Sequence, residues 1–357
     1  MDQLVLYNKI VKISFRGWLT LITLILLAIV IILAWPELVK AWNLLGRVDI
    51  WILVLLLPVQ FCSYYATGGM IFSYLRAKGD LEDVSHWTTT RLALELNFVN
   101  HIFPSGGAAG FSYLAWVLKK HGISVSRSTM AQLVRYTLTF ISFVMLLILS
   151  MIIMAIRHEI DPVILVVGFA IAGVVIFGTW LIIWLINNRK RMQRFSKWLT
   201  STVNTIVRWF TGGKKKNAIN GKGLKAFFEG IHGDFNAIRA ERGILLQPFL
   251  WATITNIFDV TLIWIAFWAL GHPLDPFLLF IAFGLASMTS VFAVTPGGTG
   301  VYETVMVAFL AASGVTPDVA IAGTLLARMV LLSGTILFGY VFYQLTVLKY
   351  GKHPANS

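Results

Sequence analysis

Two arginines, Arg135 and Arg328, lie inside long apolar stretches of the chain. Burying an ionisable side chain in an apolar medium costs at least about 2.5–3.5 kcal/mol, so each such residue needs a partner or a task. A planar guanidinium group binds carboxylate or phosphate through two parallel hydrogen bonds, which makes it the preferred cation for an anion in a dry site. We favour an anion-binding task for Arg328 and leave a binding and a structural role both open for Arg135.

Four other ionisable side chains interrupt apolar sequence. Glu303 can contribute to a polar cavity, or it can form an ion pair with Arg328 that only locks helices together, and both interpretations stay open. For Glu95 and Asp259 we favour a structural role. His101 has no second ligand at a spacing typical of metal sites, so we interpret it as structural.

Two short segments rich in proline and glycine precede the arginines at nearly equal distances, one beginning at Pro104 and the other at Pro296. Proline lacks an N–H group and glycine has no helical preference, so both segments should break helices. Inside a bilayer, such broken backbone is tolerated only within protein or beside a water-filled cavity. Paired breaks at matching places in two halves of a chain indicate the binding site of a transporter. The residues that we therefore assign to a substrate site are Arg135, Arg328, Glu303, Pro104, Gly106, Gly107, Pro296, Gly297, Gly298 and Gly300.

The composition is that of a membrane protein. Of the 357 residues, 57% are hydrophobic and 13% charged, with a mean hydropathy of +0.78, whereas a soluble domain has about 25% charged residues. A bilayer span needs about 20 apolar residues; we predict full spans at 16–36, 50–75, 131–156, 162–187, 245–270 and 319–347. The first is too long for a signal peptide and is expected to be an uncleaved anchor. The single cysteine excludes an internal disulfide. We predict an all-α polytopic membrane domain over residues 1–357.

The distribution of Lys and Arg decides how the two Pro/Gly segments, 84–118 and 276–313, are placed. A single crossing by 84–118 would put Lys119 and Lys120 outside, together with a strongly basic loop. If each segment instead enters the membrane and returns as two half-helices, the basic residues all fall in the cytoplasm, with both chain termini. We therefore predict two re-entrant hairpins in repeats 84–156 and 276–347, entered from opposite sides and so inverted. A tight hairpin of two full spans gives the same topology and is the alternative.

The loop 188–243 holds 13 Lys/Arg against 3 Asp/Glu, which is +10 of the formal net charge of +13. Apolar residues recur in it at helical spacing, which is typical of an amphipathic helix in the headgroup layer. Basic charge beside membrane spans indicates orientation and anionic lipid rather than nucleic acid. A plain connector and a lipid-gathering surface both fit this loop.

The half-helices expected after Gly107 and Gly300 would point their N-termini into the membrane centre, where free N–H groups attract anions. Together with the arginines they predict a site for a lipid phosphate. The Gly-Gly pairs are not a nucleotide-binding loop, because no Gly-Lys-Ser/Thr follows them. No catalytic motif is visible, so we expect neither an enzyme nor a cofactor or metal.

The motif Pro296-Gly297-Gly298-Thr299-Gly300 with Glu303, preceded by Ser287 and Ser290, resembles the flippase-like integral membrane family, as do Asn97, Asn100, Pro104, Gly106 and Gly107. This family includes the membrane region of bacterial lysylphosphatidylglycerol synthase, the multiple peptide resistance factor. The resemblance covers about residues 10–347 and implies a lipid-translocating domain with two re-entrant elements, and it adds Asn100 to the site. Ala108-Ala109 stands where more polar residues are expected, which leaves the headgroup undecided. Since no aminoacyl-transferase domain follows Ser357, we expect a separate enzyme to make the lipid.

The sequence thus predicts a flippase of the inner cell membrane that moves an aminoacyl-phospholipid, a phospholipid or a polyprenyl-phosphate sugar between leaflets. A membrane-embedded enzyme acting on such a lipid and a small-solute secondary transporter are the alternatives. The expected partners are membrane lipids with anionic headgroups. Whether the chain forms a homo-oligomer stays open.

Overall fold

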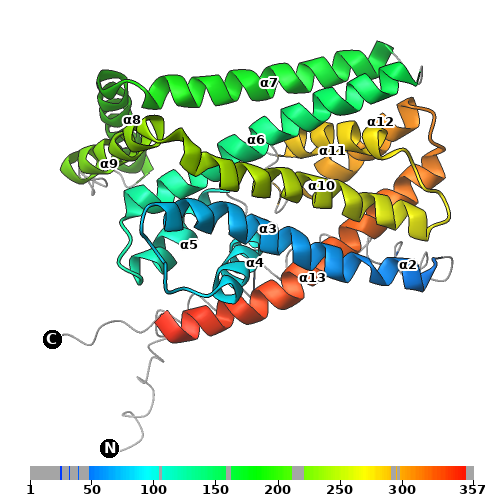
Figure 1. The fold of residues 1–357 in the computed structure, drawn as a ribbon, viewed down its shortest axis with the longest axis horizontal. Helices are drawn as coiled ribbons and strands as arrows, with labels where there is room; N and C mark the ends of the chain where they lie inside the picture. The colour runs from blue at the N-terminus through cyan, green and yellow to red at the C-terminus, as the bar shows by residue number, and fades with distance from the viewer. Residues whose placement is uncertain are drawn as a thin grey trace, which may run out of the picture.

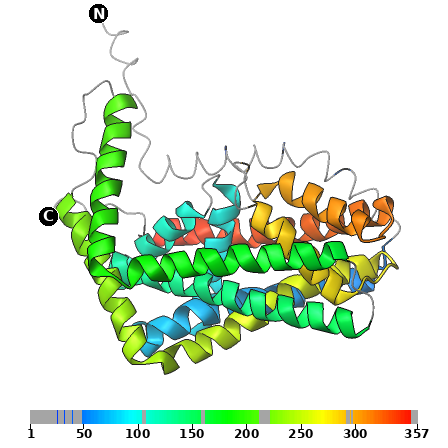
Figure 2. The same ribbon diagram turned by 90° about the horizontal axis from the view of Figure 1, so that it is seen from above.

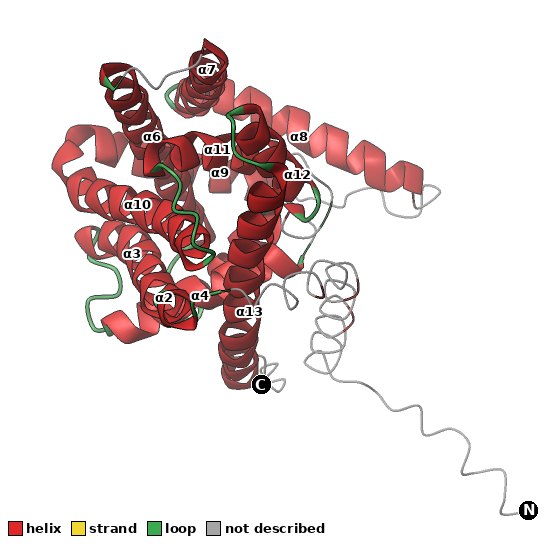
Figure 3. Ribbon diagram, turned by 90° about the vertical axis from the view of Figure 1, so that its right-hand side faces the viewer, coloured by secondary structure: helices red, strands yellow, loops and turns green. Residues whose placement is uncertain are grey.

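The structure is a computed structural model that describes residues 48–103, 107–157, 162–210, 221–290, 295 and 298–350, with the single positions 25, 32 and 39. Within these ranges all regular structure is helical and no strand is present, as Figure 3 shows. The long helices run side by side along the longest axis of the molecule (Figure 1). The prediction of an all-α polytopic membrane protein is confirmed.

Five helical stretches of the described chain are long and apolar enough to cross a bilayer. They correspond to five of the six predicted spans, and the sixth, at 16–36, falls outside the described residues apart from positions 25 and 32. The helices concerned are α2 (Ile50–Val54) with α3 (Leu56–Ala77), α6 (Val125–Ile156), α7 (Pro162–Ile186), the 3₁₀ turn η3 (Arg242–Leu245) with α10 (Leu246–Ala269), and α13 (Pro317–Tyr350).

Local sequence explains where these helices begin and break. Asp49 caps α2, because its carboxylate accepts hydrogen bonds from the N–H groups of Trp51 and Ile52. Pro58 lies three residues into α3 and has no N–H to donate to the carbonyl of Val54, where α2 ends. Ser124 caps α6 by accepting a hydrogen bond from the N–H of Arg127 at 3.2 Å, which starts this helix six residues before the predicted span.

Two pairs of shorter helices occupy the Pro/Gly segments. The first pair is α4 (His86–Ile102) and α5 (Ala108–Lys119), and the second is α11 (Pro276–Ser290) and α12 (Val301–Ala312). At 1.5 Å per residue, a helix of 12 residues reaches about 18 Å, well short of a hydrocarbon core of about 30 Å. The members of each pair pack against each other. In Figure 1 the first pair lies toward one end of the long axis and the second toward the opposite end.

The basic loop folds into α8 (Arg189–Phe210) and α9 (Gly221–Ala240), with 211–220 outside the described residues. Figure 2 shows α8 running crosswise to α7 at one end of the bundle. Phe195 of α8 contacts Phe228 of α9, with ring centroids 5.7 Å apart. Arg189 also donates a hydrogen bond to Glu229 at 2.9 Å, which lowers the pKa of that exposed carboxyl group.

The buried apolar side chains form two clusters, and each cluster contains one of the short-helix pairs. Leu279 of α11 and Phe309 of α12 belong to the first, and Val99 of α4 and Leu114 of α5 belong to the second. The two broken segments are therefore built into the core of the bundle rather than attached to its surface.

The Lys/Arg distribution predicts which end of the bundle faces the cytoplasm. In a Cys62→Ser background, we expect cysteines placed at Lys120 and Lys225 to react with a membrane-impermeant maleimide only after the cells are opened. A cysteine at His272, in the turn between α10 and α11, should react in intact cells, because this turn is predicted to lie outside. Labelling of position 120 or 225 in intact cells would refute the predicted inversion of the repeats.

Candidate functional site

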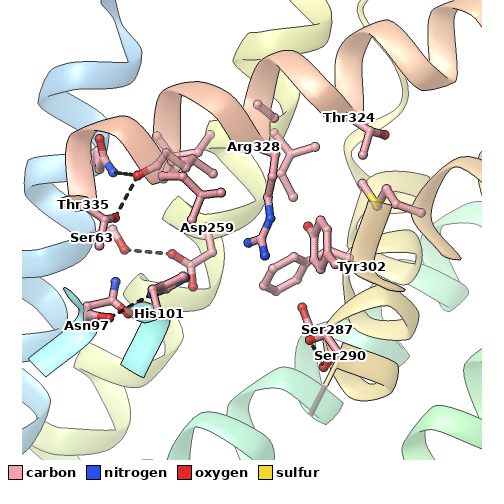
Figure 4. A pocket seen from close by; sticks show the side chains of 18 of the residues that line it. Ser63, Asn97, His101, Asp259, Ser287, Ser290, Tyr302, Thr324, Arg328 and Thr335 are labelled. Carbon is pink, nitrogen blue, oxygen red and sulfur yellow. Dashed lines mark hydrogen bonds between the residues drawn. The ribbon is translucent and has the colours of Figure 1, made fainter. Parts of the chain in front are cut away.

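A cavity of about 290 Å³ lies inside the bundle and is lined by six helices, namely α3, α4, α10, α11, α12 and α13. Both short-helix pairs thus contribute to its wall, as Figure 4 shows for the labelled side chains. Its polar lining residues are Gln60, Ser63, Tyr64, Asn97, His101, Asp259, Ser287, Ser290, Tyr302, Thr324, Arg328 and Thr335. Twelve polar side chains from six helices are therefore gathered around one space.

Arg328 projects into this cavity from α13 and is held there by two neighbours on α12 (Figure 4). Its Nε donates a hydrogen bond to Oε1 of Glu303 at 2.7 Å, in an ion pair whose side chains are 13% and 7% exposed. Its Cζ lies 4.6 Å from the centre of the Tyr302 ring, within the range of a cation–π contact. The ion pair that the sequence left open is present, and it orients Arg328 without removing it from the cavity wall.

Glu303 also occupies the positive end of α12. Its Oε2 accepts a hydrogen bond from the N–H of Gly300, the N-cap of this helix, at 2.6 Å. A carboxylate at the N-terminus of a helix satisfies free N–H groups and is stabilised by the helix dipole. The helix end that we expected to attract a substrate anion is thus partly occupied by an anion of the protein itself.

Glycine is required on the N-terminal side of α12. Gly298 and Gly300 have φ values of +71° and +88°, in the left-handed region that other residues rarely adopt. A Cβ atom on Gly298 would lie 2.5 Å from the Cβ of Ser290, at the end of α11. Close approach of α11 and α12 therefore depends on the missing side chain. Pro296 and Gly297 lie outside the described residues.

The break between α4 and α5 is also stabilised by specific residues. Gly107 has φ +90° and is the N-cap of α5. Asn100 of α4 accepts a hydrogen bond on Oδ1 from the N–H of Gly110 at 3.1 Å and so links the two half-helices. A Cβ on Gly110 would meet this oxygen at 2.2 Å, so the link needs a glycine. Pro104 and Gly106 lie outside the described residues.

Arg135 does not line this cavity. Its Cζ lies 4.3 Å from the ring centre of the neighbouring Tyr136, and that ring stacks on Phe111 of α5 with centroids 5.7 Å apart. Arg135 Nε is buried without a hydrogen-bond partner among the described residues. The matching sequence positions of Arg135 and Arg328 do not bring the two arginines to one cavity in this conformation.

Glu95 is fully buried and forms contacts with three elements. Its carboxylate accepts hydrogen bonds from the hydroxyls of Tyr113 at 2.5 Å and Thr346 at 2.9 Å, and it pairs with Arg91 Nε at 3.1 Å. Both of its oxygens are thus used to hold α4 to α5 and α13. This geometry agrees with the structural role that we favoured for Glu95.

Asp259, for which we favoured a structural role, lines the cavity. Its Oδ1 accepts a hydrogen bond from Ser63 Oγ on α3 at 2.8 Å.

His101 also lines the cavity, and its Nδ1 donates to the carbonyl of Asn97 at 2.8 Å, which leaves Nε2 as the acceptor of the neutral ring. The hydroxyls of Tyr64 on α3 and Thr335 on α13, which line the same cavity, share a short hydrogen bond.

The sequence reasoning missed the part of this wall that single hydroxyl groups supply. Ser63 and Tyr64 lie in a run that is apolar enough to be a span, and Tyr302 lies in a shorter apolar helix. Single hydroxyl groups do not change these patterns. Asp259, a carboxylate in the middle of an apolar helix, was a usable signal, and we favoured a structural role for it.

The chain as a whole matches the family model described as the lysylphosphatidylglycerol synthase TM region over residues 19–339. The chain belongs to this family. It is 21% identical over 234 residues to a UPF0104 membrane protein of Methanothermobacter thermautotrophicus, covering 65% of this chain and 67% of the relative. It is 25% identical over 252 residues to a UPF0104 membrane protein of Methanocaldococcus jannaschii, covering 68% and 70%. No solved structure matches the chain.

The match confirms the family that the sequence motifs resemble. Together with the apolar helices, it also confirms the predicted multi-pass membrane location. What the cavity offers chemically is one oriented guanidinium, one carboxylate and several hydroxyl and amide groups, set in an apolar bundle. Such a lining can hold a small, polar, charged group and offers little to an apolar one.

Proposed function

We propose that this protein moves a phosphate-bearing lipid between the two leaflets of the cell membrane. The observation that carries the proposal is Arg328, a partly buried guanidinium fixed by Glu303 at the wall of a polar cavity inside the bundle. Arg328 Nε donates to Glu303, and a planar guanidinium suits the oxygens of a phosphate better than an ammonium group does. Membership of the family supports a role with membrane lipids.

The size of the cavity supports a headgroup as its occupant. Pockets for drug-sized ligands measure about 300–1,000 Å³, and 290 Å³ lies just below that range. A headgroup could enter this space while the acyl or prenyl tails stay in the bilayer. The cargo candidates remain an aminoacyl-phospholipid, a plain phospholipid and a polyprenyl-phosphate sugar.

The two broken segments supply the elements for alternating access. Each contributes to the cavity wall, and the two pairs lie toward opposite ends of the bundle (Figure 1). We propose that they are re-entrant hairpins of inverted repeats, with both termini in the cytoplasm and the protein in the inner membrane. In such transporters, one half rocks against the other around a site near the bilayer centre.

A leaflet assay in proteoliposomes tests this proposal. Vesicles carry labelled phosphatidylglycerol, its lysyl ester or a polyprenyl phosphate, and a membrane-impermeant quencher reports the lipid in the outer leaflet. We expect the protein to expose at least one of these labels far faster than in protein-free vesicles.

Two results would favour the alternatives. Uptake of a water-soluble headgroup such as glycerol phosphate, without movement of any lipid, would indicate a small-solute transporter. A chemical change in a labelled lipid, detected by mass spectrometry, would indicate a membrane-embedded enzyme. Labels that stay in their leaflet for all three lipids would refute a flippase with these cargoes.

A further inference from the structure

We infer that Asp259, hydrogen-bonded to Ser63, is the site where a proton binds during the transport cycle, so that lipid movement is coupled to a proton gradient. This inference rests on the proposed lipid transport and adds its energy source. It starts from a contrast among three carboxylates described above, of which Glu95 and Glu303 are buried and Asp259 is partly buried. Glu95 pairs with Arg91, and Glu303 pairs with Arg328, whereas Asp259 has no ion-pair partner among the described residues.

The surroundings of Asp259 leave its charge unbalanced. The titratable or charged side chains that share the cavity with it are Tyr64 on α3, His101 on α4, Tyr302 on α12 and Arg328 on α13. The positive charge of Arg328 is balanced by Glu303. No other residue of α10 or α11 is charged, and Arg135 of α6, which also packs on α10, lies outside the cavity lining.

The hydrogen bond that Asp259 does form is compatible with both protonation states. Ser63 Oγ donates to the carboxylate at 2.8 Å, and a hydroxyl group can reverse and accept once the carboxyl group carries a proton. Protonation therefore needs no rearrangement of α3 and α10, which pack closely side by side. A proton requires only one carboxylate, whereas hard metal cations take several oxygen ligands. The described site shows one carboxylate and one hydroxyl in contact, so it suits a proton better than a metal cation.

Coupling follows from the sign of the charges. With Asp259 ionised, the cavity holds one excess negative charge and repels an anionic headgroup. With Asp259 protonated, this repulsion is gone and Arg328 can attract the phosphate. A proton taken up from one side would therefore enter with the lipid anion and leave on the other side, so the two move in the same direction.

The test is a pH gradient across proteoliposomes that carry labelled lipid. If one proton moves with each lipid, each pH unit is worth about 1.36 kcal/mol, or a tenfold change in the ratio of label between leaflets. We expect the wild type to approach this shift and to reverse it when the gradient is reversed. Asp259→Asn should show no shift, whatever its own exchange rate, because the amide cannot take up a proton.

Asp318→Asn is the matched control, since Asp318 is exposed in the first turn of α13, away from the cavity, and should respond as the wild type does. A wild type that exchanges lipid but ignores the pH gradient would refute the coupling and leave the flippase standing. A response to a sodium gradient alone, or an Asp259→Asn variant that still follows pH, would also refute it.

Infrared spectroscopy gives a readout that does not depend on transport. Titration of the wild type should show the C=O band of a protonated carboxyl group, and the Asp259→Asn variant should lack it. If no lipid moves in any sample, the proposed flippase fails, and this band alone then decides whether Asp259 binds a proton. An unchanged band in the Asp259→Asn variant would overturn the assignment.

Discussion

Replacing Arg328 by glutamine is expected to reduce lipid movement by about tenfold to a hundredfold, because the phosphate loses a charged hydrogen-bonding partner worth about 1.5–3 kcal/mol. Arg328→Lys keeps the charge, but a single ammonium group cannot offer one planar edge to Glu303 and another to the headgroup. We therefore expect the lysine variant to lie between the wild type and the glutamine variant. The measurement is the rate of label exposure in proteoliposomes.

Transport and stability of a double variant, measured together, separate this role from that of a purely structural ion pair. Removing one member of a buried pair costs about 3–5 kcal/mol, because the other charge stays buried without its partner. Both Arg328→Gln and Glu303→Gln should therefore lower the midpoint of thermal unfolding in detergent, and the double variant should regain much of the loss. Transport by the double variant should stay low. A double variant that is stable and fully active would show that Arg328 only holds α12 to α13.

The sequence was sufficient to predict the long helices and the positions of the breaks, because both follow from local chemistry. Continuous apolar residues indicate spans, and the segments around Gly107 and Gly298 contain residues that cannot continue a helix. The pair between Glu303 and Arg328 could be foreseen as one of two options, because both charges lie in apolar surroundings and need a partner.

The cavity wall could not be predicted in the same way. Ser63 and Asp259 are 196 positions apart and touch only because α3 and α10 pack together. Helix packing also explains the difference between the two arginines. Arg135 folds over the ring of Tyr136, beside α5, although its place in the sequence matches that of Arg328. Matching positions in a sequence repeat determine neither the rotamer that a side chain adopts nor the face of the helix that packs against its neighbours.

Leucine at Gly298 is expected to abolish most lipid movement while the long helices remain folded. The left-handed backbone at φ +71° costs a residue with a side chain roughly 1–2 kcal/mol. The added Cβ would lie 2.5 Å from the Cβ of Ser290, so α11 and α12 must also move apart. Because Ser290, Tyr302 and Arg328 all line the cavity, that separation would distort the wall around the headgroup site.

Gly173→Leu is the matched control for this substitution. Gly173 lies exposed in the middle of α7, and an added Cβ there meets no atom within 4 Å, so the variant should transport at the wild-type rate. The variant Gly300→Ala separates the effect of backbone strain from that of a steric collision, since Gly300 has φ +88° but open space around an added Cβ. We expect this variant to lose stability without the full loss of transport. If Gly298→Leu moves lipid as fast as Gly173→Leu, the close contact of α11 and α12 serves only packing, and the second break is not part of the transport mechanism.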